Sequence, residues 1–334
     1  MISQPICFRS AQNSDAATVN LMTATAQVLE QYLDHLRRSG AEVHTMIDRW
    51  GVANYHYVWR TESERSRGVV QLVHGIGEHA GRYIAIAGRL TAAGCDVVAD
   101  DHRGHGATGA AALLDVPEDD PAVAAQTDTL RAMGRLRKGG LEATILAVLA
   151  VSRAAAELGD GRPPVIFGHS WGSFITQHLL NIRSQTYSAA VLTGTAYCQP
   201  GWVTPSRFNR RWDAPGASGY EWLSSRPEVG RAFAADPLTT DRTVLSSHGF
   251  WDALRLFTRP TPRIRSDIPL LIANGADDPV GSPKSVERLA QAYRDVGLQH
   301  VDVRLYEGMR HEIFNEVDGD QVISDIIAWI EQQL

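Results

Sequence analysis

The chain has 334 residues, of which 44% are hydrophobic and 21% are charged. This composition allows a buried core and excludes a chain that is disordered throughout. The formal net charge is −6, and the 32 basic residues form no dense run. Because nucleic-acid binding needs a basic surface, we expect no nucleic-acid partner.

The cysteines and the apolar segments bear on the compartment. Cys7, Cys95 and Cys198 are far apart and form no Cys-x-x-Cys pair, which argues against a disulfide framework and a zinc site. The N-terminus lacks the pattern of a secretory signal, and the longest apolar helical run, residues 143–151, is too short to span a bilayer. We therefore expect a cytoplasmic protein with no transmembrane segment, and the sequence leaves its oligomeric state open.

The first element in chain order is a predicted amphipathic helix over residues 15–38, with Gly40 as its stop signal. We expect it to pack onto the rest of the protein as a helical extension comprising residues 1–45. From about residue 52, short β-rich runs alternate with helical patterns, which indicates β-α-β units and a mostly parallel sheet. The predicted strands are residues 52–59, 68–73, 95–99, 164–168, 188–193, 269–274 and 301–306.

Helices are predicted between these strands, for example over residues 284–294, and near the C-terminus over residues 322–330. Two segments interrupt the alternation. Residues 197–267 are rich in Pro, Arg, Trp and Ser and show no strand pattern, so we expect an inserted cap, or lid. Residues 109–140 form a second excursion. The α/β core is then expected over residues 46–196 and 268–334.

The strongest chemical signal is Gly168-His169-Ser170-Trp171-Gly172, which lies between the apolar run PPVIF and the helical run SFITQHLL. This is Gly-x-Ser-x-Gly in the strand-turn-helix context of a nucleophile elbow, a turn so tight that small residues must flank the serine. The elbow places the serine oxygen above the sheet, at the positive N-terminus of the next helix. We predict that Ser170 is a catalytic nucleophile.

A serine nucleophile needs a histidine base oriented by a carboxylate, and in an open α/β sheet each partner should follow a strand. His311 follows the predicted strand 301–306, whereas His300 precedes it, so we assign His311 as the base. The strand IPLLIAN leads into Asp277 and Asp278. We choose Asp278 as the acid and keep Asp277 as the alternative.

An oxyanion hole needs two backbone N–H groups, one after the nucleophile and one from the loop after an earlier strand. Trp171 would supply the first. Residues 74–77 follow GVVQLV, and Ile76 is the predicted second donor. Nearby, we expect Glu78, His79 and Arg82 to fix this loop by ion pairs and hydrogen bonds.

Five stretches, in the same order along the chain, carry a resemblance to a known family. HGIGEHAGRY, DHRGHG, GHSWGS, GADDPVG and YEGMRHEIFNE resemble the monoacylglycerol lipase and lysophospholipase-like group of α/β-hydrolases, also catalogued with the serine aminopeptidases. The resemblance covers roughly residues 66–334. It implies an α/β-hydrolase fold, Ser170, Asp278 and His311 as the triad, and Ile76 and Trp171 as oxyanion donors.

This chain departs from the family pattern in three ways. It has Trp171 where the family usually has Met, a longer excursion at 109–140, and the additional N-terminal helix. These departures bear on the shape of the acyl site, so the resemblance implies the mechanism more directly than the substrate.

Two of these motifs admit another interpretation. Residues 74–81 mimic a dinucleotide fingerprint, but Glu78 would stand where a pyrophosphate needs positive potential. His102 and His105 with Asp101 could suggest metal ligands, yet a structural turn held by glycines is the better reading of that spacing.

The predicted function is hydrolysis of carboxylic esters, on a monoacylglycerol or lysophospholipid-like small molecule by resemblance, with neither a metal nor an organic cofactor required. Amide, peptide or lactone cleavage by the same triad stays open. A non-catalytic α/β-hydrolase-fold binding protein is disfavoured, because such a protein has no need to retain all three triad residues.

Overall fold

The computed structural model describes residues 12–115, 133–204 and 207–334. Its centre is one sheet whose eight strands lie in the order β1-β2-β4-β3-β5-β6-β7-β8. The first two pairings, β1 with β2 and β2 with β4, are antiparallel, and the remaining pairings are parallel. The strands are β1 (Ala41–Ile47), β2 (Ala53–Trp59), β3 (Val69–Val73), β4 (Asp96–Asp100), β5 (Val165–His169), β6 (Ala189–Thr193), β7 (Leu270–Gly275) and β8 (Val301–Tyr306).

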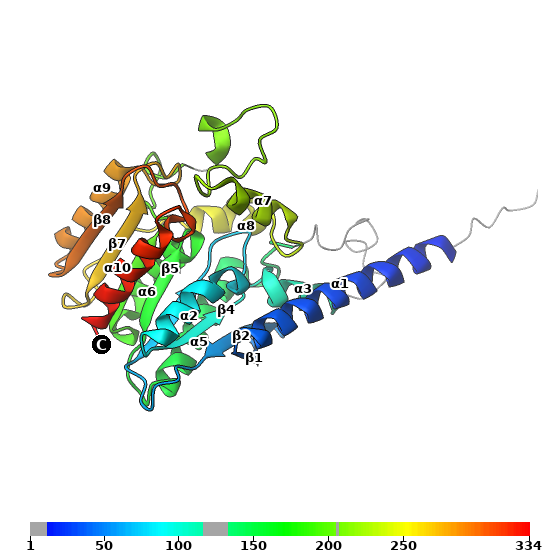
Figure 1. Ribbon diagram of the computed structural model, residues 1–334, viewed down its shortest axis with the longest axis horizontal. Coiled ribbons are helices and arrows are strands. Elements are labelled where there is room, and N and C mark those ends of the chain that lie inside the picture. Colours follow the sequence, from blue (N-terminus) through cyan, green and yellow to red (C-terminus); the bar gives the residue numbers. More distant parts are fainter. Residues whose placement is uncertain (1–11, 116–132, 205–206) are drawn as a thin grey trace, which may run out of the picture.

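Helices cover both faces of this sheet (Figure 1). The α-helices are α1 (Gln12–Arg38), α2 (Ile84–Ala92), α3 (Gly106–Leu114), α5 (Gly140–Leu158), α6 (Trp171–Arg183), α7 (Pro227–Ala235), α8 (Val244–Arg255), α9 (Pro283–Asp295) and α10 (Gly319–Glu331). Short 3-10 helices are η1 (Ala80–Tyr83), η3 (Ser184–Thr186), η4 (Phe208–Arg211) and η5 (Ile313–Asn315). Of the residues described, none lie in a helix that is both long and apolar enough to cross a membrane.

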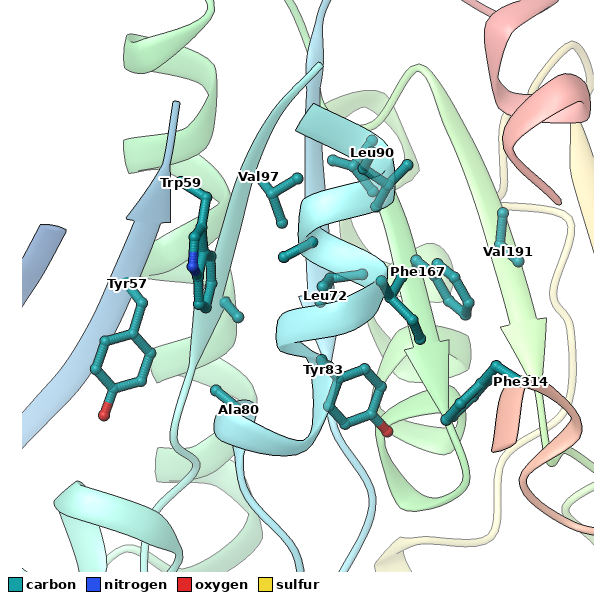
Figure 2. Close-up of a cluster of buried hydrophobic side chains, with 14 of the residues drawn as sticks. Tyr57, Trp59, Leu72, Ala80, Tyr83, Leu90, Val97, Phe167, Val191 and Phe314 are labelled. Atoms are coloured by element: carbon teal, nitrogen blue, oxygen red, sulfur yellow. The ribbon is translucent and has the colours of Figure 1, made fainter. Parts of the chain in front are cut away.

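The hydrophobic core has two halves, one on each face of the sheet. Side chains of β5 alternate between them: Val165 and Phe167 join the half that contains α2 and α10, and Ile166 joins the half that contains α5, α6 and α9. Figure 2 shows the first half, where Leu90 of α2 and Phe314 approach Phe167. Burial on both faces explains why these strands read as continuous apolar runs, as is typical of parallel sheets.

The seven predicted strands are all present, with bounds that agree to within one residue. No strand is predicted before residue 52, but β1 is present and pairs with β2 along its whole length. The N-terminal extension predicted over residues 1–45 is therefore helical only to Arg38, and residues 41–47 add a strand to the sheet. β1 was not predicted because it is a mostly exposed edge strand, and the apolar alternation that begins at Ala41 and Val43 does not continue beyond Thr45.

The two predicted interruptions are placed differently. Within residues 197–267, the described part contains η4, α7 and α8 and no strand, and it separates β6 from β7 as expected. Figure 1 shows α7 and α8 lying together beyond the sheet. Of the excursion predicted at 109–140, residues 116–132 lie outside the described residues.

Candidate active site

Ser170 occupies the turn between β5 and α6. Its backbone has φ 54° and ψ −122°, a strained conformation for a residue with a side chain. A Cβ on Gly172 would stand 2.5 Å from the His74 carbonyl oxygen and closer still to that of Val73, and one on Gly168 would stand 2.6 Å from the Gly172 carbonyl oxygen. Both glycines are therefore required by close backbone approach, as the elbow pattern predicts.

The loop after β3, residues 74–77, lies against the same turn. A Cβ on Gly75 would be 3.0 Å from the Cβ of Ser170. Trp171 is the first residue of α6, so its N–H has no acceptor within the helix. The two predicted oxyanion donors, Ile76 and Trp171, thus belong to segments that meet beside the serine.

His311 and Asp278 form a buried pair. The Nδ1 atom of His311 lies 3.0 Å from each carboxylate oxygen of Asp278 and donates to them. Asp278 also accepts from the side chain of Asn274 at 3.0 Å and from the backbone N–H of Val280 at 2.8 Å. The Nε2 atom of His311 is buried and has no hydrogen-bond partner among the described residues, so it is available to a group that enters the site.

The serine and the histidine come together around Gly194, which follows β6. The backbone N–H of Ser170 donates to the Thr193 carbonyl at 2.9 Å. A Cβ on Gly194 would lie 2.8 Å from the Cε1 atom of His311. The C-terminal ends of β5, β6, β7 and β8 therefore gather Ser170, Gly194, Asp278 and His311 at one edge of the sheet, where open α/β sheets carry their sites.

Charges around His311 set its proton affinity. Burial lowers the pKa of the imidazole, but Asp278, with Glu312 and Glu78 beyond it, more than offsets this effect. The pKa of His311 consequently lies above the ordinary value of 6.5. A base with such a pKa can take a proton from a hydroxyl and later return it to a leaving group.

The alternative acid, Asp277, is placed elsewhere. Its side chain is 35% exposed and pairs with Arg211 of η4 at 2.6 Å. Asp278 is 4% exposed and is the carboxylate that contacts His311.

The side chain of Trp171 is buried among imidazoles. Its ring centroid lies 5.4 Å from that of His102, 5.3 Å from that of His105 and 4.9 Å from that of His248 of α8. Burial lowers the pKa of His248 to about 4 and that of His105 to about 3. The rings of His248 and His105 are therefore neutral near pH 7. Trp171 joins the elbow to the 197–267 segment by packing against His248.

The residues considered as metal ligands have other partners. His102 Nδ1 contacts Asp100 at 2.7 Å, and His105 Nδ1 contacts the Arg103 carbonyl at 2.9 Å. Asp101 accepts from the Tyr32 and Tyr57 hydroxyls and from two backbone N–H groups. Across the described ranges, no three His, Cys, Asp or Glu side chains are grouped so that they could hold a metal ion.

Sequence reasoning did not identify three residues that shape this site. Trp222, from the 197–267 segment, stacks at a tilt on His311 with 4.8 Å between ring centroids. Asn274 orients Asp278, and Glu312 follows His311 directly. The amide at the end of a strand and the carboxylate next to His311 were visible in the sequence, but the position of Trp222 depends on folding of the inserted segment.

The chain has relatives among known proteins. The model of the serine aminopeptidase (S33) family matches residues 64–318. A monoacylglycerol lipase of Mycolicibacterium smegmatis is 30% identical over 306 residues, covering 87% of this chain and 97% of the relative.

Solved structures show the same fold. A carboxyl esterase from Bacillus coagulans superposes with a TM-score of 0.73 at 23% identity, covering 88% of this chain and 98% of the other. A soluble variant of the Saccharomyces cerevisiae monoglyceride lipase superposes with a TM-score of 0.68 at 18% identity, covering 88% and 96%. The α/β-hydrolase fold predicted from the sequence is thereby confirmed.

Proposed function

Because the chain belongs to the serine aminopeptidase (S33) family of α/β-hydrolases and is an ester hydrolase of the monoacylglycerol lipase type, we propose that it works through a Ser170-His311-Asp278 triad. The observation that carries this proposal is the pairing at His311. Its Nδ1 is held by Asp278, and its Nε2, beside the turn that carries Ser170, is buried with no hydrogen-bond partner in the part of the chain that the structure describes. That is the arrangement a general base requires.

In the proposed mechanism, His311 removes the proton from Ser170 as the serine oxygen attacks the ester carbonyl. The backbone N–H groups of Ile76 and Trp171 stabilise the negative charge of the tetrahedral intermediate. Collapse of the intermediate breaks the bond to the ester oxygen, which takes the proton from His311 and departs as the alcohol, while the acyl group stays on Ser170. Water, activated by the same histidine, then releases the carboxylic acid.

We propose that residues 197–267 act as a cap over this site. Four contacts support the assignment: Trp222 stacks on His311, His248 packs on Trp171, Thr240 donates to the Gly77 carbonyl at 2.9 Å, and Asp236 contacts His79 at 2.9 Å. The segment therefore touches the base, the elbow and the oxyanion loop. Such a cap decides which acyl groups enter, so specificity lies in it.

The proposed substrates are monoacylglycerols or lysophospholipid-like esters, supported by the similarity to the Mycolicibacterium smegmatis enzyme. The test is hydrolysis of a p-nitrophenyl ester series from short to long acyl chains, followed by a monoacylglycerol and a lysophospholipid. Ser170→Ala should abolish turnover and fluorophosphonate labelling, whereas Ser63→Ala, at an exposed position between β2 and β3, should change neither. Ester hydrolysis that survives in Ser170→Ala would contradict the proposed mechanism.

The family description keeps amide cleavage as the second candidate. Aminoacyl p-nitroanilides and lactones, assayed beside the esters, separate the two. A kcat/KM for amides above that for every ester would assign the site to amide or peptide cleavage on the same triad.

A further inference from the structure

The guanidinium of Arg82, in η1, bonds two carboxylates that come from different loops. It donates to Glu78 at 2.7 Å and to both oxygens of Glu312 at 2.6 and 2.9 Å. The side chains of Arg82, Glu78 and Glu312 are only 14%, 5% and 2% exposed. The ring of Phe233, from α7, lies 5.0 Å from the guanidinium carbon. Arg82 thus occupies a low-dielectric position in which ion pairs are strong and poorly screened by salt.

One end of this ion-pair cluster holds the oxyanion loop. The Oε1 atom of Glu78 accepts from the backbone N–H of Gly75 at 2.6 Å and from the Tyr83 hydroxyl at 2.8 Å. Gly75 precedes Ile76 and lies against Ser170. A shift of Glu78 would therefore move the peptide that carries the predicted oxyanion donor.

The other end holds the loop of the base. Glu312 follows His311 directly, its backbone N–H donates to the Leu223 carbonyl at 2.7 Å, and its side chain accepts from Asn315 at 2.7 Å. Arg82 and Glu312 are 230 positions apart in the sequence. Their bond is therefore a tertiary link between the segment after β3 and the segment after β8.

We infer that Arg82 is a positioning residue: it links the oxyanion loop to the loop of the base, and so fixes the distance between Ile76 and His311. This inference rests on the proposed function, because the distance between Ile76 and His311 matters to the reaction only if both loops act on one acyl group. Enzymes lose up to about a hundredfold in rate when catalytic groups are misplaced by about 1 Å.

The cluster also has an electrostatic consequence for His311. Two carboxylates and one guanidinium leave a net charge of −1 beside the imidazole. Among the described residues, Asp278 and His169 are the other titratable groups in contact with His311, and the ring centroid of His169 lies 4.8 Å from that of His311. Glu312 and Glu78 both raise the pKa of His311. Removing the positive charge of Arg82 should therefore raise that pKa further, whereas neutralising Glu312 should lower it.

The experiment measures kcat/KM against pH for Ser170-dependent hydrolysis of a p-nitrophenyl ester, with thermal unfolding of each variant. Arg82→Met should lower kcat/KM at the optimum at least about tenfold and move the acid limb to higher pH. Glu312→Gln should move the acid limb to lower pH. Arg82→Lys keeps the charge but loses the bidentate hydrogen bond to Glu312. The acid limb of its pH profile should therefore stay at the wild-type pH while kcat falls. The control is Arg89→Met, which breaks an exposed pair with Asp320 and should leave rate and pH profile unchanged.

Acid limbs that move in opposite directions for Arg82→Met and Glu312→Gln would support the inference, because mere loss of structure would not change sign with charge. Limbs that stay at the wild-type pH, or move together, would overturn it. If Arg82→Met does not fold, the test rests on Arg82→Lys and Glu312→Gln. An unchanged kcat in Arg82→Lys, together with an acid limb of Glu312→Gln at the wild-type pH, would refute the positioning role of Arg82. A wild-type protein with neither esterase activity nor fluorophosphonate labelling would instead refute the proposed function.

Discussion

Replacing Asp278 with Asn tests the assignment of the acid most directly. The carboxylate accepts from His311 Nδ1 through both oxygens, and the geometry around it is fixed by Asn274 and Val280. An amide in the same place offers one acceptor and one donor group, so it no longer holds the imidazole in the tautomer that leaves Nε2 free to accept a proton. The equivalent change in a serine protease triad costs about 10⁴ in kcat, which corresponds to about 5.5 kcal/mol of transition-state stabilisation.

The matched control is Asp277→Asn, one position earlier. Asp277 lies in an exposed pair with Arg211, and pairs of this kind contribute about 0–1 kcal/mol to stability. We expect Asp277→Asn to retain most of the wild-type kcat/KM. Its free energy of unfolding should lie within about 1 kcal/mol of that of the wild type. The two substitutions remove the same charge from neighbouring residues, so a difference between them reports on contact with His311.

The assay is kcat/KM for a p-nitrophenyl ester from pH 5 to pH 9, with chemical denaturation of both variants. Burial lowers the pKa of His311 and Asp278 raises it, so residual activity of Asp278→Asn should extend to lower pH than that of the wild type. A large loss in Asp277→Asn with a mild effect in Asp278→Asn would refute the assignment and the reasoning from burial behind it.

Two further predictions concern elements that hold the site. Gly172→Ala would press a methyl group against the Val73 and His74 carbonyl oxygens, so it should lower the free energy of unfolding by about 1–3 kcal/mol and reduce esterase activity at least about tenfold. The control is Gly88→Ala in α2, where a Cβ would meet no atom of the described residues within 4 Å, and which should stabilise by about 0.5–1 kcal/mol. Equal effects of the two substitutions in denaturant unfolding would argue against the elbow packing. Tyr32→Phe removes the hydroxyl that donates to Asp101 and accepts from the Gly81 N–H, each at 3.1 Å. It should lower the free energy of unfolding by about 1–3 kcal/mol because that N–H is left unpaired. An unfolding midpoint identical to that of the wild type would show that α1 does not anchor this region.

The elbow and the order of the site residues could be predicted because each depends on short stretches of sequence. Gly168 and Gly172 flank Ser170 within five residues, and the runs on either side identify a strand and a helix. The proposed base and the proposed acid then follow from a rule of parallel sheets, since each comes after a strand. Only the choice between Asp277 and Asp278 needed the fold, because both follow β7 and only burial and direction separate them.

The contacts that join distant segments could not be predicted in this way. Glu78, His79 and Arg82 were expected to fix the oxyanion loop by local bonds, and Glu78 does bond Gly75. Arg82, however, also bonds Glu312 across 230 positions. No local pattern reveals which of the many carboxylates in a sequence will meet a given arginine, because that partner is decided by how β3 and β8 are brought to the same edge of the sheet.

The N-terminal helix α1 is a second case in which a local pattern predicts an element but not its contact partners. Its amphipathic pattern predicts that one side packs onto the protein, and Leu36 is indeed fully buried. The pattern does not reveal the partners of Tyr32. Its hydroxyl donates to Asp101, and its ring packs edge-on against His79 with 4.9 Å between ring centroids. The Nε2 atom of His79 in turn contacts Asp236 of the proposed cap. The helix precedes the region that the family model matches, residues 64–318, yet it contacts the loop that leads from the oxyanion donors into η1. An element outside the family match therefore constrains the segment that follows the proposed oxyanion donor Ile76.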